Sequence, residues 1–109
     1  MKLIGNKPIK IIQGDSYEYK IKFSQEINTL IEKIYFTSED LTISSEMEFD
    51  EVNEVWSFKF LPTKTNVEPS DYYTYDITIK FKDGDVLSET GINLTISTKQ
   101  NPVENILGE

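Results

Sequence analysis

The sequence predicts a single all-β domain, an antiparallel β-sandwich of about seven strands. Three observations lead to this prediction. The chain has 109 residues, which is the size of one ordinary domain. Apolar and polar residues alternate with a period of two in one segment after another, as they do in strands with one buried face. No long segment has apolar residues at the spacing of a helix.

The first clear strand is expected in residues 16–24. Its apolar residues alternate with charged ones, and they are Tyr17, Tyr19, Ile21 and Phe23. One face of this strand should therefore join a core while the other meets water. Gly14-Asp15-Ser16 comes just before it and is typical of a turn that leads into the strand.

The middle of the chain predicts three further strands. Residues 33–38 alternate around Ile34 and Phe36, and residues 56–60 alternate around three aromatic side chains. Between them, the alternation in residues 41–49 is interrupted at Ser44-Ser45, which predicts a bulge or a break between two short strands. The polar residues 50–54 predict a hairpin connection, so the strands on either side of it should pair.

The longest alternation covers residues 73–82 and predicts a central strand. Asp83-Gly84-Asp85 follows it, and these residue types favour a tight turn because Gly and Asp tolerate a positive φ. The chain is then expected to return as a strand through residues 86–96. Gly91 within that strand predicts a bulge or a close backbone approach.

The domain organisation follows from these elements. Residues 1–8 are expected to be an N-terminal arm, residues 9–98 the sandwich, and residues 99–109 a flexible C-terminal tail with Pro, Asn and Gly. Two segments, 26–33 and 63–67, are expected to form at most a helical turn, because neither reaches the usual length of a helix.

Composition excludes several classes of function. The chain has no cysteine and no histidine, which removes disulfides, cysteine-ligated zinc, thiol nucleophiles and imidazole catalysis. A net charge of -8 repels phosphate backbones, so we expect no nucleic-acid partner. Polar residues interrupt the N-terminal segment and apolar runs are short throughout. We therefore expect no signal peptide and no membrane span.

Acidic residues are the only candidates for general acid and base chemistry. They occur as Glu39-Asp40, Asp50-Glu51 and Asp83 with Asp85, and each group falls in a predicted turn, which explains them more simply than catalysis. Calcium could use the oxygens at 83–85 or at 50–54, but it needs about six to eight of them and one short loop supplies too few. The sequence therefore predicts no enzyme and no catalytic, cofactor-binding or metal-binding residues.

Aromatic residues raise the alternative of a carbohydrate-binding surface, because sugar rings stack on exposed aromatic faces. Most of them are in phase with the predicted core, namely Tyr17, Tyr19, Trp56, Tyr73 and Tyr75. Tyr35 and Tyr72 are the expected surface aromatics. Core packing is therefore the favoured explanation for the aromatic content.

Taken together, the motifs resemble a family of small immunoglobulin-like proteins of tailed bacteriophages and prophages, related to the N-terminal domain of the phage baseplate upper protein. Residues 11–16 (IIQGDS) resemble the family's I-x-x-G-D-S/T opening, residues 61–77 resemble its segment ending in Y-x-Y-D-I, and residues 87–96 are similar to its closing strand. The chain departs from the family at 70–71, where a Gly is usual, and at 28–32, where a D-L-T-G-A element is replaced.

The resemblance covers residues 9–98 and implies an immunoglobulin-like sandwich with no catalytic residues. It also implies a non-enzymatic structural or assembly protein of a phage tail or baseplate, made in the bacterial cytoplasm and located in the virion. Its partners would be other phage structural proteins, and a homo-oligomer is compatible with that role. The alternative function is a surface adhesion or carbohydrate-binding sandwich module.

Overall fold

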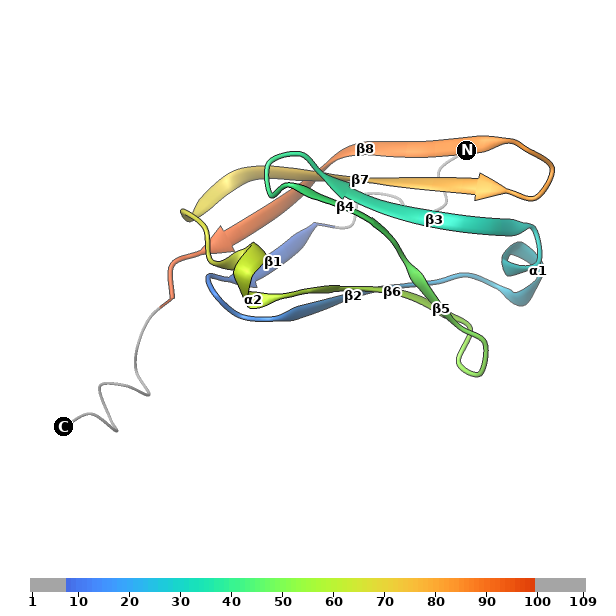
Figure 1. The fold of residues 1–109 in the computed structure, drawn as a ribbon, viewed down its shortest axis with the longest axis horizontal. Helices are drawn as coiled ribbons and strands as arrows, with labels where there is room; N and C mark the ends of the chain where they lie inside the picture. The colour runs from blue at the N-terminus through green and yellow to red at the C-terminus, as the bar shows by residue number, and fades with distance from the viewer. Residues whose placement is uncertain (1–7, 100–109) are drawn as a thin grey trace.

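The computed structural model describes residues 8–99, which form two β-sheets packed face to face (Figure 1). The five-stranded sheet has the order β1-β8-β7-β3-β4, and the three-stranded sheet has the order β2-β6-β5. The strands are β1 Ile9–Ile12, β2 Tyr17–Lys22, β3 Ile31–Ser38, β4 Ile43–Glu46, β5 Glu48–Asp50, β6 Val55–Phe60, β7 Ser70–Phe81 and β8 Val86–Ser97. The predicted all-β sandwich is confirmed, with eight strands among the described residues where about seven were expected.

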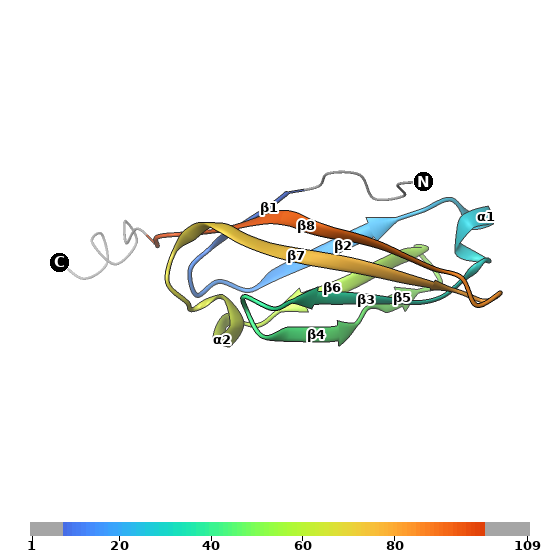
Figure 2. The ribbon, with the colours of Figure 1, turned by 90° about the horizontal axis from the view of Figure 1, so that it is seen from above.

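Two helices of a single turn connect the strands, as the short segments predicted. Helix α1 spans Gln25–Asn28 between β2 and β3, and helix α2 spans Pro62–Thr65 between β6 and β7. Ser24 caps α1, because its side chain accepts a hydrogen bond from the backbone N–H of Ile27 at 3.3 Å. The two helices lie at opposite ends of the sandwich (Figures 1 and 2).

The long hairpin of β7 and β8 forms the middle of the five-stranded sheet, so the predicted central strand is confirmed. Its turn contains Gly84 with a φ of 98°. Further along, Tyr75 pairs with Ile92 whereas Ile77 pairs with Glu89, so one extra residue enters β8. Gly91 lies in this bulge with a φ of 67°, as its position in the sequence predicted.

Strand β1 was not predicted. It pairs in parallel with β8, with Ile9 opposite Leu94, whereas the other strand pairs of the described residues are antiparallel. Ile9 and Ile11 are buried, but two apolar residues in four are too short an alternation to distinguish a strand from the approach to a turn. The turn expected at 14–16 does follow, with a φ of 80° at Gly14.

The chain crosses from one sheet to the other at Met47. Strand β4 ends in the five-stranded sheet and β5 begins in the three-stranded sheet, so two short strands are present as expected. The break expected at Ser44-Ser45 is wrong, because both serines lie inside β4 and pair with Thr37 and Phe36 of β3. The side chain of Met47 is buried between the sheets, which fixes the crossing one residue after β4 ends.

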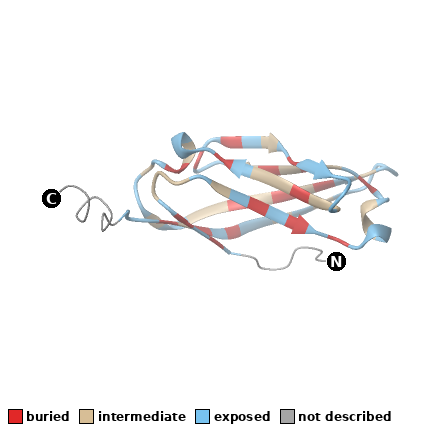
Figure 3. Ribbon diagram, turned by 90° about the horizontal axis from the view of Figure 1, so that it is seen from below, coloured by how far each residue is buried: buried red, intermediate tan, exposed pale blue. Residues whose placement is uncertain are grey.

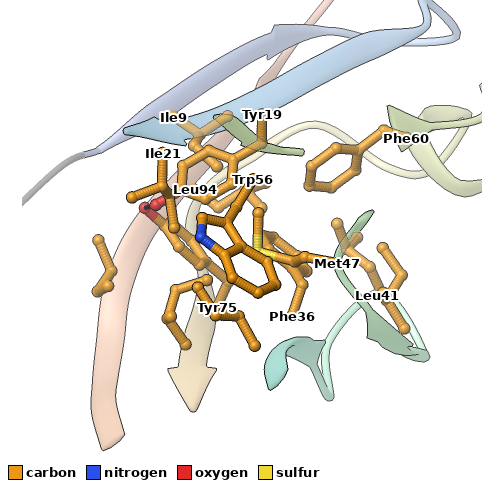
Figure 4. Close-up of a cluster of buried hydrophobic side chains, with 14 of the residues drawn as sticks. Ile9, Tyr19, Ile21, Phe36, Leu41, Met47, Trp56, Phe60, Tyr75 and Leu94 are labelled. Carbon is orange, nitrogen blue, oxygen red and sulfur yellow. Dashed lines mark hydrogen bonds between the residues drawn. The ribbon is translucent and has the colours of Figure 1, made fainter. Parts of the chain in front are cut away.

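An aromatic cluster fills the space between the sheets. The ring of Phe36 is stacked on Tyr75 and Phe58, with centroids 5.0 and 4.7 Å away, and the rings of Tyr19 and Phe60 meet it edge-on. Buried residues alternate with more exposed ones along the strands (Figure 3), and the labelled side chains of Figure 4 gather between the sheets. The inward direction predicted for Tyr19, Trp56 and Tyr75 is confirmed.

Two of the predicted segments, the N-terminal arm and the C-terminal tail, lie mostly outside the residues that the structure describes. Of the expected N-terminal arm, residues 1–7 lie outside the described residues, and so do residues 100–109 of the expected C-terminal tail. Both segments therefore stay predictions.

Candidate interaction groove

A groove of about 790 Å³ opens on the flank of the sandwich where the chain crosses between the sheets. It lies between the start of β3, the crossing residue Met47, and the β5–β6 hairpin. Its lining residues are Asn28, Ile31, Glu32, Glu46, Met47, Glu48, Phe49, Glu51, Trp56 and Lys82. We call this set the crossing groove.

Strand pairing explains why the flank is open at this point. Strand β4 pairs with β3 only along Tyr35–Ser38, and the last contact beyond it is the backbone N–H of Met47 donating to the carbonyl of Ile34 at 2.7 Å. The edge of β3 at 31–33 therefore has no strand beside it on this side within residues 8–99. Strand β5 is the outer strand of the other sheet. Two unpaired strand edges border the crossing groove.

Phe49 and Trp56 form the aromatic wall of the crossing groove. They face each other across the β5–β6 pair, with ring centroids 4.6 Å apart and planes tilted by 36°. Trp56 is only 6% exposed, whereas Phe49 is 37% exposed and presents apolar surface to solvent. Phe49 therefore adds exposed aromatic surface to the wall of the groove.

The indole of Trp56 makes a hydrogen bond to the side chain of Asn28. Its Nε1–H donates to Oδ1 of Asn28 at 3.0 Å, and Nδ2 of Asn28 donates to the carbonyl of Phe23 at 3.3 Å. Asn28 is the last residue of α1, so the one-turn helix positions the wall of the groove. These two hydrogen bonds link the indole of Trp56, which packs against Phe49, to the end of α1.

Four carboxylates are among the lining residues, and strand alternation places that of Glu48 on the opposite face of β5 from Phe49. Glu32 is paired with Lys80 at 3.5 Å, and Glu46 is paired with Lys33 at 3.9 Å, both on the exposed rim. Glu48 and Glu51 have no ion pair within the part of the chain that the structure describes. Counting Lys82 in the lining and the two paired lysines beside it, the four carboxylates still leave the crossing groove with a small net negative charge.

The acidic residues that the sequence offered for chemistry serve the turns instead. The carboxylate of Asp50 accepts hydrogen bonds from the side chain of Asn53 at 2.8 Å and from the backbone N–H groups of Asn53 and Val52. The side-chain bond from Asn53 is the main cause of a pKa below the ordinary value for Asp50. Asp83 accepts from the N–H of Asp85 at 2.9 Å in the same manner. The predicted turn role of both loops is confirmed.

The remaining acidic pair, Glu39-Asp40, lies in the turn between β3 and β4. Asp40 accepts a hydrogen bond from the backbone N–H of Thr74 through Oδ2, at 3.0 Å, and so ties that turn to β7. In residues 8–99, Asp and Glu nowhere gather in a group of three that could hold a metal ion. Over the same residues, the helices are too short and polar to span a membrane.

The aromatic residues expected on the surface behave differently from one another. Tyr72 is 88% exposed, as predicted, whereas Tyr35 is half-buried on β3. Tyr17 and Tyr73, which were expected to point into the core, are also half-buried, and the hydroxyl of Tyr73 donates to the carbonyl of Glu68. Sequence reasoning did not identify the crossing groove, although the apolar Phe49 between acidic residues was a visible signal.

The chain was compared with known proteins. No family model and no curated protein matches it. Among solved structures, it is similar to the extracellular domain of mouse leukocyte-associated immunoglobulin-like receptor 1 in a strand-swapped dimer. The two share a TM-score of 0.51 and 13% identity over 92% of this chain and 89% of that one. The extracellular domain of the voltage-gated sodium channel beta4 subunit, described as a parallel homodimer, gives a TM-score of 0.48 and 19% identity over 92% and 98%. The likeness to the mouse receptor domain shows that the sandwich is immunoglobulin-like.

Proposed function

We propose that this protein is a non-catalytic module that works through protein–protein contacts. The observation that carries the proposal is the crossing groove, which is lined by a partly exposed aromatic ring and bordered by two unpaired strand edges. Strand edges and exposed aromatic rings are both features through which proteins recognise one another. The absence of His and Cys from the sequence supports the non-catalytic part of the proposal.

The context we propose for these contacts is a bacteriophage tail or baseplate, with other phage structural proteins as partners. Its support is the sequence resemblance over residues 9–98, together with the immunoglobulin-like sandwich that the resemblance implied. The virion is the corresponding location. Repeated copies in a symmetric tail would also give a homo-oligomer a role, and the mouse receptor domain shows that a sandwich of this kind can exchange strands in a dimer.

Mass spectrometry of purified particles tests this context directly. We expect the protein in particles of the source phage at a constant ratio to a known tail protein, after washing at high salt. Its complete absence from particles, while it is abundant in the infected cell, would contradict a virion component. Neighbouring tail genes around its own gene would give independent support.

A carbohydrate-binding module is the second candidate, and one observation favours it. Tyr72 and Phe49 present aromatic surface to solvent, and such faces can stack on sugar rings. A titration with host wall polysaccharide and a broad glycan panel would decide between the two functions. Saturable glycan binding that is lost in Tyr72→Ala would support this second function, and silence over the panel would reject it.

A further inference from the structure

The chemistry of the residues that line the crossing groove indicates which kind of partner it binds. Its wall is apolar through Phe49, Trp56 and Met47. Its lining carries four glutamates and Lys82, and two of the glutamates are paired with lysines outside the lining. We propose that it binds an extended, basic segment of a partner protein, in which apolar side chains alternate with Lys or Arg. This inference rests on the proposed function, because it names the kind of partner that the contact module takes.

The extended conformation follows from the strand edges. The unpaired edge of β3 at 31–33 and the outer edge of β5 both offer backbone N–H and C=O groups to a chain lying in the crossing groove. A segment that adds itself to such an edge satisfies these groups and alternates its side chains between the groove and solvent. A helix would leave the backbone groups of both edges to water.

Charge complementarity determines the sign of the charge that the partner segment carries. Glu51 has no ion pair within residues 8–99, so a cation placed beside it gains an interaction without breaking one. The exposed face of Phe49 also attracts Lys and Arg through its π electrons. An acidic segment would meet repulsion from the groove and from the net charge of -8.

Trp56 supplies a reporter for the test, because it is the only tryptophan of the chain and lies in the groove wall. The probe is a synthetic hexapeptide of alternating Lys and Leu, titrated into the full chain while tryptophan fluorescence is recorded. We expect a saturable change that weakens as salt is added. A hexapeptide of alternating Glu and Leu should produce no change. Equal responses to both peptides would overturn the basic partner, and no response to either would overturn the groove as a peptide site.

A pair of matched variants separates a specific site from general attraction. The variant Glu51→Gln should weaken binding of the basic peptide by about twofold to fivefold, the range expected for one exposed ion pair. The control Glu39→Gln removes the same charge from an exposed position outside the groove lining and should leave the affinity unchanged. Equal weakening by both variants would reject the site.

Two further experimental outcomes would identify a different occupant or separate this inference from the proposed function. Sedimentation of the full chain as a dimer that the basic peptide dissociates would make a second copy the occupant, and would overturn the partner segment. Failure of the peptide to bind, while the protein is still found in purified particles, would reject the inference about the groove and leave the proposed function standing. The two failures are therefore distinguishable.

Discussion

Two pairs of aromatic residues in this sandwich differ in how completely they are buried. Phe36 and Tyr75 stack between the sheets with centroids 5.0 Å apart, and both are buried because strands of the opposite sheet cover them. Phe49 and Trp56 are just as close, at 4.6 Å, yet Phe49 remains 37% exposed. The difference is that no strand covers the flank where the chain crosses between sheets. An aromatic residue in a strand therefore belongs to the core only where the opposite sheet continues past it.

The largest expected effect on stability comes from removing a ring of the buried pair. Phe36→Ala should lower the free energy of unfolding by about 3–5 kcal/mol, because it leaves a cavity among tightly packed rings. Phe49→Ala should cost only about 1 kcal/mol, since it removes one aromatic contact from a half-exposed site. Urea unfolding of both variants measures the difference. Similar losses would mean that the flank is packed as tightly as the core.

A smaller effect is expected at the polar support of the groove wall. Asn28→Ala leaves Nε1–H of the buried Trp56 without its partner and should cost about 1–3 kcal/mol. The tryptophan emission of the folded variant should also shift, because the indole loses its hydrogen bond. Glu26→Ala, an exposed change in the same helical turn, is the matched control. A variant of Asn28 with wild-type stability and emission would show that the bond does not hold the wall.

A further effect on stability is expected at the bulge of β8 in the five-stranded sheet. Gly91 has a φ of 67°, and a Cβ added there would have no atom within 4 Å. Gly91→Ala should therefore cost about 1 kcal/mol through backbone conformation alone, without a steric clash. Thr90→Ala, at the exposed neighbouring position, is the control for the loss of strand surface. A neutral Gly91→Ala would mean that the bulge relaxes to a negative φ.

The smallest expected effect is a dependence of the free energy of unfolding on acid pH, which arises in the β5–β6 hairpin. Hydrogen bonds, first of all from the side chain of Asn53, hold the pKa of Asp50 below its ordinary value in the folded protein. The stabilisation is therefore present above the ordinary pKa of aspartate and is lost as the pH falls through the lowered pKa. Asp50→Asn should flatten this part of the acid denaturation curve, measured as the urea midpoint between about pH 5 and pH 2. An unchanged curve would contradict the role of Asp50 in the turn.

Alternation predicted the elements whose burial is regular. Strands β2 and β7 were found because each alternates over many residues, and the turn at Gly84 was found because its residue types need little context. Strand β1 was missed because its four residues show only two apolar positions. Its pairing with β8 is decided by contacts between distant parts of the chain, which local pattern does not contain.

The crossing at Met47 shows why the groove was beyond the reach of sequence pattern. Ile43, Met47 and Phe49 share one parity, so the alternation continues while the chain leaves one sheet and enters the other. Parity tells which side of a strand faces inward, but it does not tell which sheet the strand joins. The start of β3 and the β5–β6 hairpin therefore come to line one groove, although local pattern does not relate them.

The proposal that most needs a test is that the crossing groove makes this protein's contacts and that these contacts are made in a phage particle. The most direct test is to quantify the protein by mass spectrometry in particles assembled with Phe49→Ser, and with Ile12→Ser as control. Ile12 is 48% exposed on β1, at the opposite edge of the five-stranded sheet. The account predicts that the Phe49 variant folds but is depleted from particles while the Ile12 variant is retained at the wild-type amount. Retention of the Phe49 variant at the wild-type amount would contradict it.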